Sequence, residues 1–165
     1  MAGLTVDDLV AMEEIKRLKY KYVRCLDQKR WDDIAECFVP DAVASYGGGA
    51  WAFEGRDAIL DFLRSSMGSE KFLSGHRVGQ PEIDITGPDT ATAIWALSDT
   101  VAQLEFGVDI RGGAFYEDEY VKVDGEWKIK STGYKRTYEE MEPRSGDITL
   151  TASLFETDGR SSLGG

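Results

Sequence analysis

The stretch FLSGHRVGQPEIDI, residues 72–85, lies where the apolar pattern of the chain has changed from a helical period to alternation. Four of its residues can face inward in one strand: His76, Val78, Ile83 and Ile85. Pro81 between them predicts a bend or bulge. His76 is the only histidine in 165 residues, and imidazole suits proton transfer at neutral pH. A lone histidine is more often a core or surface residue, so His76 gains a catalytic role only if other residues converge on it.

The composition is typical of one acidic, globular domain. With 165 residues the chain can bury roughly 70% of its unfolded surface, and its hydrophobic content is 42%. A net charge of −11 argues against nucleic acid and anionic membranes as partners, because few basic groups are present to neutralise phosphates. No apolar run approaches the ~18–20 residues that a membrane span needs. We therefore expect neither nucleic acid nor membrane as a partner.

The sequence predicts no metal and no cofactor. Cys25 and Cys37 fall in helical patterns without metal-ligand spacing, and one histidine argues against a zinc site. A phosphate loop, a dinucleotide fingerprint and a nucleophile elbow are all missing. Because the start of the chain lacks a secretory pattern, we expect reduced thiols in a cytoplasmic protein. Any chemistry must then use ordinary acid and base side chains.

The first 66 residues predict three helices. The first helix spans Thr5 to about Gln28, the second spans residues 31–38 and ends before Pro40, and the third spans residues 56–66. The apolar stripe of the first helix contains Met12, Ile15, Leu18, Tyr22, Val23, Cys25 and Leu26.

Two residues of the first helix are candidates for the site. Tyr22 faces inward with the stripe, which makes it a core residue at the least. Asp27 lies beside the stripe at the C-terminal end, where a carboxylate opposes the helix dipole. Such a local inconsistency is often functional, although Asp27 equally well begins the turn into the second helix.

The remaining pattern predicts strands. Two short ones, at residues 42–46 and 51–54, flank a glycine turn at residues 47–49. Long antiparallel strands follow at residues 72–86, 90–104, 107–123 and 126–138, with turns at residues 87–89 and at Asp124-Gly125. Together these predict an α+β fold: three N-terminal helices packed on a curved, mostly antiparallel sheet that forms a cone with an internal pocket. We expect residues 1–141 to form this domain and residues 142–165 to be a loosely ordered tail or a cover for the pocket.

This order of elements resembles the SnoaL-like branch of the nuclear-transport-factor-2-like (NTF2-like) superfamily over residues 5 to about 138. The motifs that carry the resemblance are Tyr22 and Asp27 on one helix, the run from Trp31 to Ala42, Gly75-His76, Asp99, Gly112-Gly113 with Glu119-Tyr120, and the run from Asp124 to Ile129. The pattern is most similar to cofactor-free lyases: scytalone dehydratase, bile acid 7α-dehydratase and hexachlorocyclohexane dehydrochlorinase.

The resemblance implies five catalytic positions in this chain: Tyr22, Asp27, His76, Asp99 and Arg136. It also implies a homotrimer and a small hydrophobic substrate. The dehydrochlorinase has a lysine where this chain has Tyr22, which favours a dehydratase. The second histidine of scytalone dehydratase has no counterpart here, so its substrate and its division of roles do not carry over.

In chemical terms, elimination needs a base for the C–H proton and an acid for the leaving oxygen. His76 suits the base, with Asp27 or Asp99 fixing its tautomer; a second carboxyl could stay protonated as the acid. Tyr22, helped by Tyr46 or Tyr116, could polarise a carbonyl. Arg136 could hold an enolate, carboxylate or phenolate.

Simpler interpretations exist for several of these residues. Asp99 could face solvent. Arg136 could have no role beyond pairing with nearby glutamates. Trp51, Trp95 and Phe115 could be core residues, although each could also stack on an aromatic substrate.

The sequence thus favours a cofactor-independent dehydratase-type lyase, with loss of formaldehyde or halide as variants, that acts in the catabolism of a small cyclic or aromatic compound. One alternative is an isomerase or polyketide-type cyclase that uses the same pocket without losing a group. A second alternative is a non-catalytic binding module.

Overall fold

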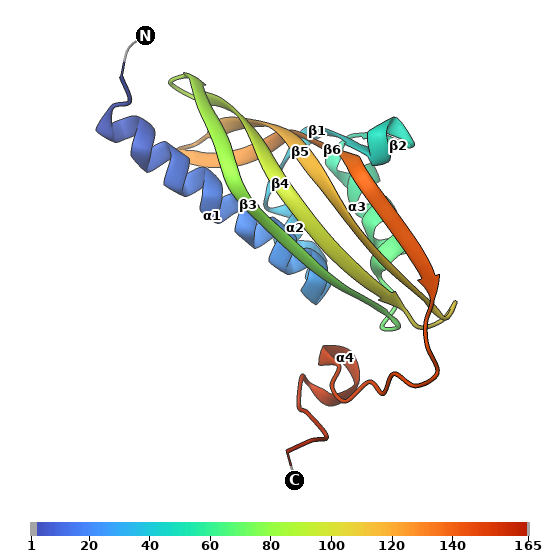
Figure 1. Cartoon of the computed structure of the whole chain (residues 1–165). Helices are drawn as coiled ribbons and strands as arrows, with labels where there is room; N and C mark the ends of the chain where they lie inside the picture. Colours follow the sequence, from blue (N-terminus) through green and yellow to red (C-terminus); the bar gives the residue numbers. More distant parts are fainter. Residues whose placement is uncertain (1–2, 165) are drawn as a thin grey trace.

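Helix α1 (Val6–Gln28) runs along one face of a curved sheet in the computed structural model, which describes residues 3–164 (Figure 1). Thr5 caps its start: the Thr5 side chain accepts from the backbone of Asp8, and the Asp8 carboxylate accepts from the backbone of Thr5. Lys29 ends it in the left-handed conformation. Tyr22 is completely buried, which confirms that it faces inward with the apolar stripe.

The second helix is shorter than predicted. Helix α2 (Trp31–Ala35) gives way to strand β1 (Phe38–Tyr46), in which Phe38 is already paired with Ile129. Pro40 lies inside this strand and does not precede it. The register of the pairing shifts between residues 38 and 43, so the missing amide hydrogen of Pro40 falls in an irregular part of the ladder. Helix α3 (Arg56–Met67) agrees with its prediction to within one residue.

Six strands form one open sheet in the order β2-β1-β6-β5-β4-β3. The remaining strands are β2 (Trp51–Glu54), β3 (Phe72–Gly87), β4 (Thr90–Gln103), β5 (Val108–Val123) and β6 (Glu126–Pro143). Only the β1–β6 pair is parallel, which confirms the mostly antiparallel α+β fold. Helix α1 packs against β3 and helix α3 against β1, so the helices line the concave side of the sheet.

Two turn signals of the sequence have the expected geometry. The register of β3 against β4 shifts between Gly79 and Glu82, so a bulge lies at Pro81 as predicted. The bulge changes the side-chain parity, which lets both halves of β3 face the interior. Asp124 and Gly125 have φ values of 51° and 81°, and these positive values match a tight hairpin between β5 and β6.

The last strand is longer than predicted. Strand β6 continues to Pro143, five residues past the predicted end, because its second half stays paired with β5 as far as Val108. A short helix α4 (Leu154–Thr157) follows a segment that leads away from the cone (Figure 1). None of the described residues beyond Pro143 lines the cavity described below. Among the described helices, none combines the length and apolarity that a membrane crossing requires.

Candidate active site

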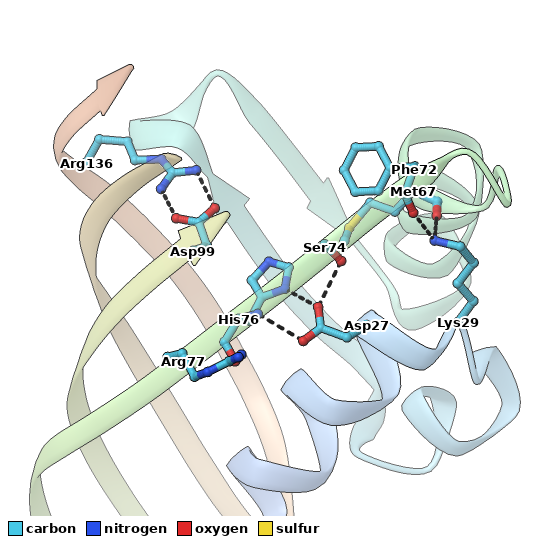
Figure 2. Close-up of polar contacts among 9 residues, drawn as sticks. All are labelled: Asp27, Lys29, Met67, Phe72, Ser74, His76, Arg77, Asp99 and Arg136. Atoms are coloured by element: carbon cyan, nitrogen blue, oxygen red, sulfur yellow. Dashed lines mark hydrogen bonds and ion pairs between the residues drawn. The ribbon is translucent and has the colours of Figure 1, made fainter. Parts of the chain in front are cut away.

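Asp27 and His76 form a hydrogen-bonded pair between the last turn of α1 and strand β3 (Figure 2). Asp27 Oδ1 lies 2.6 Å from His76 Nδ1, and Asp27 Oδ2 accepts from the His76 backbone at 2.9 Å. Ser74 Oγ donates to Oδ1 at 2.8 Å. A carboxylate that accepts at Nδ1 places the proton there, so the lone pair of a neutral His76 ring is on Nε2. Of the two candidate partners, the structure therefore pairs Asp27 with His76.

These three hydrogen bonds explain why a carboxylate is tolerated at the C-terminal end of α1. They replace the water that Asp27 would otherwise need and outweigh its unfavourable position in the helix dipole. Lys29 fixes the same helix end, because its Nζ donates to the carbonyl oxygens of Met67 and Phe72 at 2.7 Å each (Figure 2). The end of α1 is thus tied to the beginning of β3.

Asp99 lies opposite His76 on the neighbouring strand β4, and it binds Arg136. The Asp99 carboxylate is 5% exposed and accepts from Arg136 Nη1 at 2.5 Å and from Nη2 at 3.0 Å (Figure 2). Burial alone would lower the pKa of Arg136, and its hydrogen bonds to Asp99 reverse this, so the pKa is raised. The guanidinium therefore neutralises Asp99 before any ligand arrives.

A cavity of about 290 Å³ lies between the helices and the sheet, and the His76 ring lines it. Its wall is mainly aromatic and aliphatic; the aromatic residues are Tyr22, Tyr46, Trp51, Phe62, Phe72, Tyr116 and Tyr134. The hydroxyl groups of Tyr22 and Tyr46 lie 3.0 Å apart in a hydrogen bond. Burial raises the pKa of both phenols, and also that of Tyr116. They are neutral hydrogen-bond donors at physiological pH.

The structure brings most of the predicted site residues together. Besides His76 they are Tyr22, Tyr46, Trp51, Asp99, Tyr116 and Arg136, which all line the cavity. Asp27 supports His76 through the Nδ1 contact. No hydrogen bond to His76 Nε2 occurs within residues 3–164, which leaves this atom free for a ligand.

Two predicted substrate contacts do not lie at the cavity, and the prediction for them is corrected. Trp95 is fully buried in the core, where its Nε1 donates to Tyr120 Oη at 3.1 Å. Phe115 is 48% exposed because it alternates with Ala114 and Tyr116, which both face inward.

Several polar residues near the cavity were not predicted. Ser74 shares the inward face of β3 with His76, and this parity could have identified it. Glu139 lines the cavity next to Arg136, which simple strand alternation does not foresee. Lys19 and Asp118 form a completely buried ion pair at 2.7 Å beneath the tyrosines. The signal for Lys19 was its place on the apolar stripe, four residues from Ile15 and three from Tyr22.

With this geometry in view, comparison with known proteins gives a consistent result. The model of the SnoaL-like domain matches residues 7–133. The chain belongs to the SnoaL-like family. This confirms the resemblance to the SnoaL-like branch of the NTF2-like superfamily.

Solved structures of other NTF2-like proteins have the same fold. A provisionally assigned scytalone dehydratase of Novosphingobium aromaticivorans is 26% identical, with a TM-score of 0.77 over 96% of this chain and 99% of that one. A hexachlorocyclohexane dehydrochlorinase of Novosphingobium barchaimii is 20% identical, with a TM-score of 0.74 over 88% of this chain and 97% of that one. By sequence, a provisionally assigned cyclase of Gibberella zeae is 25% identical over 136 residues, which are 75% of this chain and 89% of that protein. Proteins similar to this chain thus carry the names of a dehydratase, a dehydrochlorinase and a cyclase.

Proposed function

We propose that this SnoaL-like protein is a cofactor-independent lyase of the dehydratase type, acting on a small hydrophobic cyclic or aromatic compound. The observation that carries the proposal is the Asp27–His76 pair, in which one imidazole nitrogen is held by a carboxylate while the ring lines an apolar cavity. A binding module has no need for such a pair. The relationship to dehydratases supports the reaction class.

His76 acts as the base. Its Nε2 takes the proton from a carbon next to a carbonyl group, and Asp27 stabilises the imidazolium that forms. The Tyr22 and Tyr46 hydroxyls lie 3.0 Å apart in a hydrogen bond, so one donates to the other and the other donates to the carbonyl oxygen on which negative charge develops. As the C–H bond breaks, the electron pair forms the new double bond and the β C–O bond breaks.

The leaving hydroxyl then needs a proton. Both oxygens of Asp99 accept from Arg136, so this side chain is not the donor. The imidazolium of His76, formed in the first step, returns the proton to the leaving oxygen, which departs as water. One histidine thus serves as base and acid in turn, and no second histidine is required.

The cavity volume supports a bicyclic substrate. A cavity of about 150 Å³ holds benzene, and this one has about 290 Å³. β-Hydroxy ketones on a fused two-ring skeleton therefore form a suitable substrate panel. Homotrimeric assembly, cytoplasmic location and a role in aromatic catabolism stay predictions.

The test is turnover of that panel, followed by ultraviolet absorbance of the new conjugated double bond and by mass spectrometry. We expect loss of one water from a substrate of the wild-type chain. His76→Ala should lower kcat/KM by about 10²–10⁴-fold, the usual contribution of a general base. Asp27→Asn should lower it by a similar factor, because an amide cannot stabilise the imidazolium.

Arg77→Gln is the matched control, because Arg77 is the exposed neighbour of His76 on β3. It should leave turnover unchanged. Full activity in His76→Ala would rule out the proposed base. If no member of the panel is turned over but one binds, a binding module is favoured over the lyase.

A cyclase or isomerase is the second candidate, and the relationship to the Gibberella zeae protein favours it. The same pair could move a proton from carbon to carbon without losing a group. Product mass separates the candidates, since elimination lowers the mass by one water and isomerisation leaves it unchanged.

A further inference from the structure

The guanidinium of Arg136 already faces two carboxylates of this chain. Asp99 accepts from Nη1 and Nη2, and Glu139 Oε2 lies 3.0 Å from Nε, although not aligned for a hydrogen bond. Among the described residues that line the cavity, Arg136 is the only lysine or arginine. One guanidinium against two carboxylates leaves this wall of the cavity with a net negative charge.

The second carboxylate comes to the cavity through a bulge in β6. Arg136 and Tyr138 pair with consecutive residues of β5, so Thr137 is one residue too many on its strand. In a regular strand Tyr138 would share the face of Arg136, and Glu139 would point outward. The extra residue reverses this order and brings Glu139 to the cavity wall.

Strand β5 leaves room for the guanidinium at the same level. Gly112 lies opposite Glu139, and a Cβ atom on it would be only 2.8 Å from Arg136 Nη1. A glycine on one strand and a bulge on the next together hold the two carboxylates around one guanidinium.

We propose that this cavity selects uncharged ligands and rejects anions, and that Glu139 is a specificity-determining residue. The inference rests on the proposed function in taking the cavity as the substrate site, and it adds the charge of the substrate. An anionic ligand would find no free cation here and would lie beside carboxylates, where like charges repel. An uncharged ligand of the same shape meets neither cost.

The test compares two probes of equal shape, 2-naphthamide and 2-naphthoate, which differ in charge at neutral pH. His76 is the only histidine, so in a chain without a histidine tag its ring proton Hε1 gives a single NMR signal. Titrating each probe and following that signal reports binding at this cavity alone. We expect 2-naphthamide to bind the wild-type chain at least about tenfold more tightly.

Two variants should change the preference. Glu139 is 54% exposed at its side chain, and Glu139→Gln removes its charge while keeping its shape. It should strengthen naphthoate binding about threefold to tenfold and change naphthamide binding by less than about twofold. Asp99→Asn frees the guanidinium for a ligand, so it should strengthen naphthoate binding by about tenfold or more.

Glu140→Gln is the matched control. Glu140 is the adjacent residue, pairs with Arg111 and does not line the cavity, so this variant makes the same change in net charge without changing the probe preference. Equal affinity of the two probes for the wild-type chain would overturn the inference, and so would an unchanged preference in both cavity variants. Failure of the wild-type chain to bind either probe would also contradict it.

The outcome of the probe-binding experiment can be distinguished from the outcome of the turnover experiment. Binding needs no proton transfer, so Asp27→Asn should lose turnover and keep the preference for the amide. A chain that shows the preference without turnover refutes only the lyase. A chain that turns over substrates but binds both probes equally refutes only the charge selection.

Discussion

Helix α1 is joined to the sheet by an ion pair and by a hydrogen-bonded pair, and the two have opposite surroundings. Lys19 and Asp118 form the first, and Asp27 and His76 form the second, about 12 Å further along the helix. Both side chains of the first pair are 0% exposed. The second pair is next to the cavity, which His76 lines.

The two pairs differ in whether a polar atom remains available to bind a ligand. Asp118 accepts from Lys19, Tyr120 and Thr132 at 2.6–2.7 Å, and the Lys19 ammonium lies 3.4 Å from the ring centroid of Tyr116. Three donors hold this carboxylate, and with both side chains 0% exposed the pair has no access for a ligand. In the second pair the carboxylate is equally well bonded, but His76 keeps one nitrogen free. A carboxylate held by several donors is therefore common to both, and the free nitrogen is what makes the second one a candidate for chemistry.

The largest effect on stability is expected from Lys19→Met. Without the ammonium, Asp118 is left as a buried charge with no cation, and such changes cost about 3–5 kcal/mol. The free energy of unfolding should fall by this amount in urea denaturation. Asp27→Asn should cost less than about 2 kcal/mol, because its partner and its surroundings are partly hydrated.

The double variant Lys19→Met/Asp118→Asn is the control for that prediction. It removes both charges and keeps an acceptor for Thr132, so it should recover part of the loss. If Lys19→Met costs no more than Asp27→Asn, the two pairs do not differ in the way that their burial indicates.

Alternation and helical period were sufficient to predict most of the fold and the inward orientation of His76 and Tyr22. His76 follows from the parity of β3, and Tyr22 follows from the apolar stripe of α1. Pro81 marks its bulge because a proline cannot donate to the ladder. Lys19 lies on the same stripe as Tyr22 and was missed because a lysine is rarely fully buried.

Three further features could not be predicted from the sequence, each for a physical reason. The bulge at Thr137 has no glycine or proline to mark it, so the inward turn of Glu139 could not be read from the pattern. Alternation predicts that Trp95 faces the interior of the cone. It does not predict whether Trp95 lies at the end of the cone that holds the cavity. The choice between Asp27 and Asp99 as partner of His76 depends on how α1 crosses β3, which is a tertiary property.

Alkaline pH should act on the tyrosines around both pairs. Burial raises the pKa of Tyr22, Tyr46, Tyr116 and Tyr120 above the ordinary value near 10. A raised folded pKa means that the unfolded chain loses its phenolic protons first. The contribution of these tyrosines to the free energy of unfolding is therefore fully present below about pH 10, and it is lost as the pH rises through their folded pKa values.

Phenolate absorbance and circular dichroism, followed together in a pH titration, check this. Part of the absorbance should appear only when the dichroism is lost. If all tyrosines ionise while the fold persists, the tyrosines around the Lys19 pair are hydrated, and the contrast between a dry and an open pair fails.

The smallest effect is expected from Ser74→Ala, and it examines the open pair alone. Ser74 donates to the same Asp27 oxygen that accepts from His76 Nδ1. Its loss leaves that contact in place, so turnover should fall only a few-fold and stability by about 1 kcal/mol or less. Ser98→Ala, at an exposed position on β4, controls for the loss of a strand hydroxyl. A decrease in kcat/KM as large as that of His76→Ala would mean that Ser74 itself takes part in the reaction, and the free nitrogen of His76 would no longer be sufficient to distinguish the two pairs.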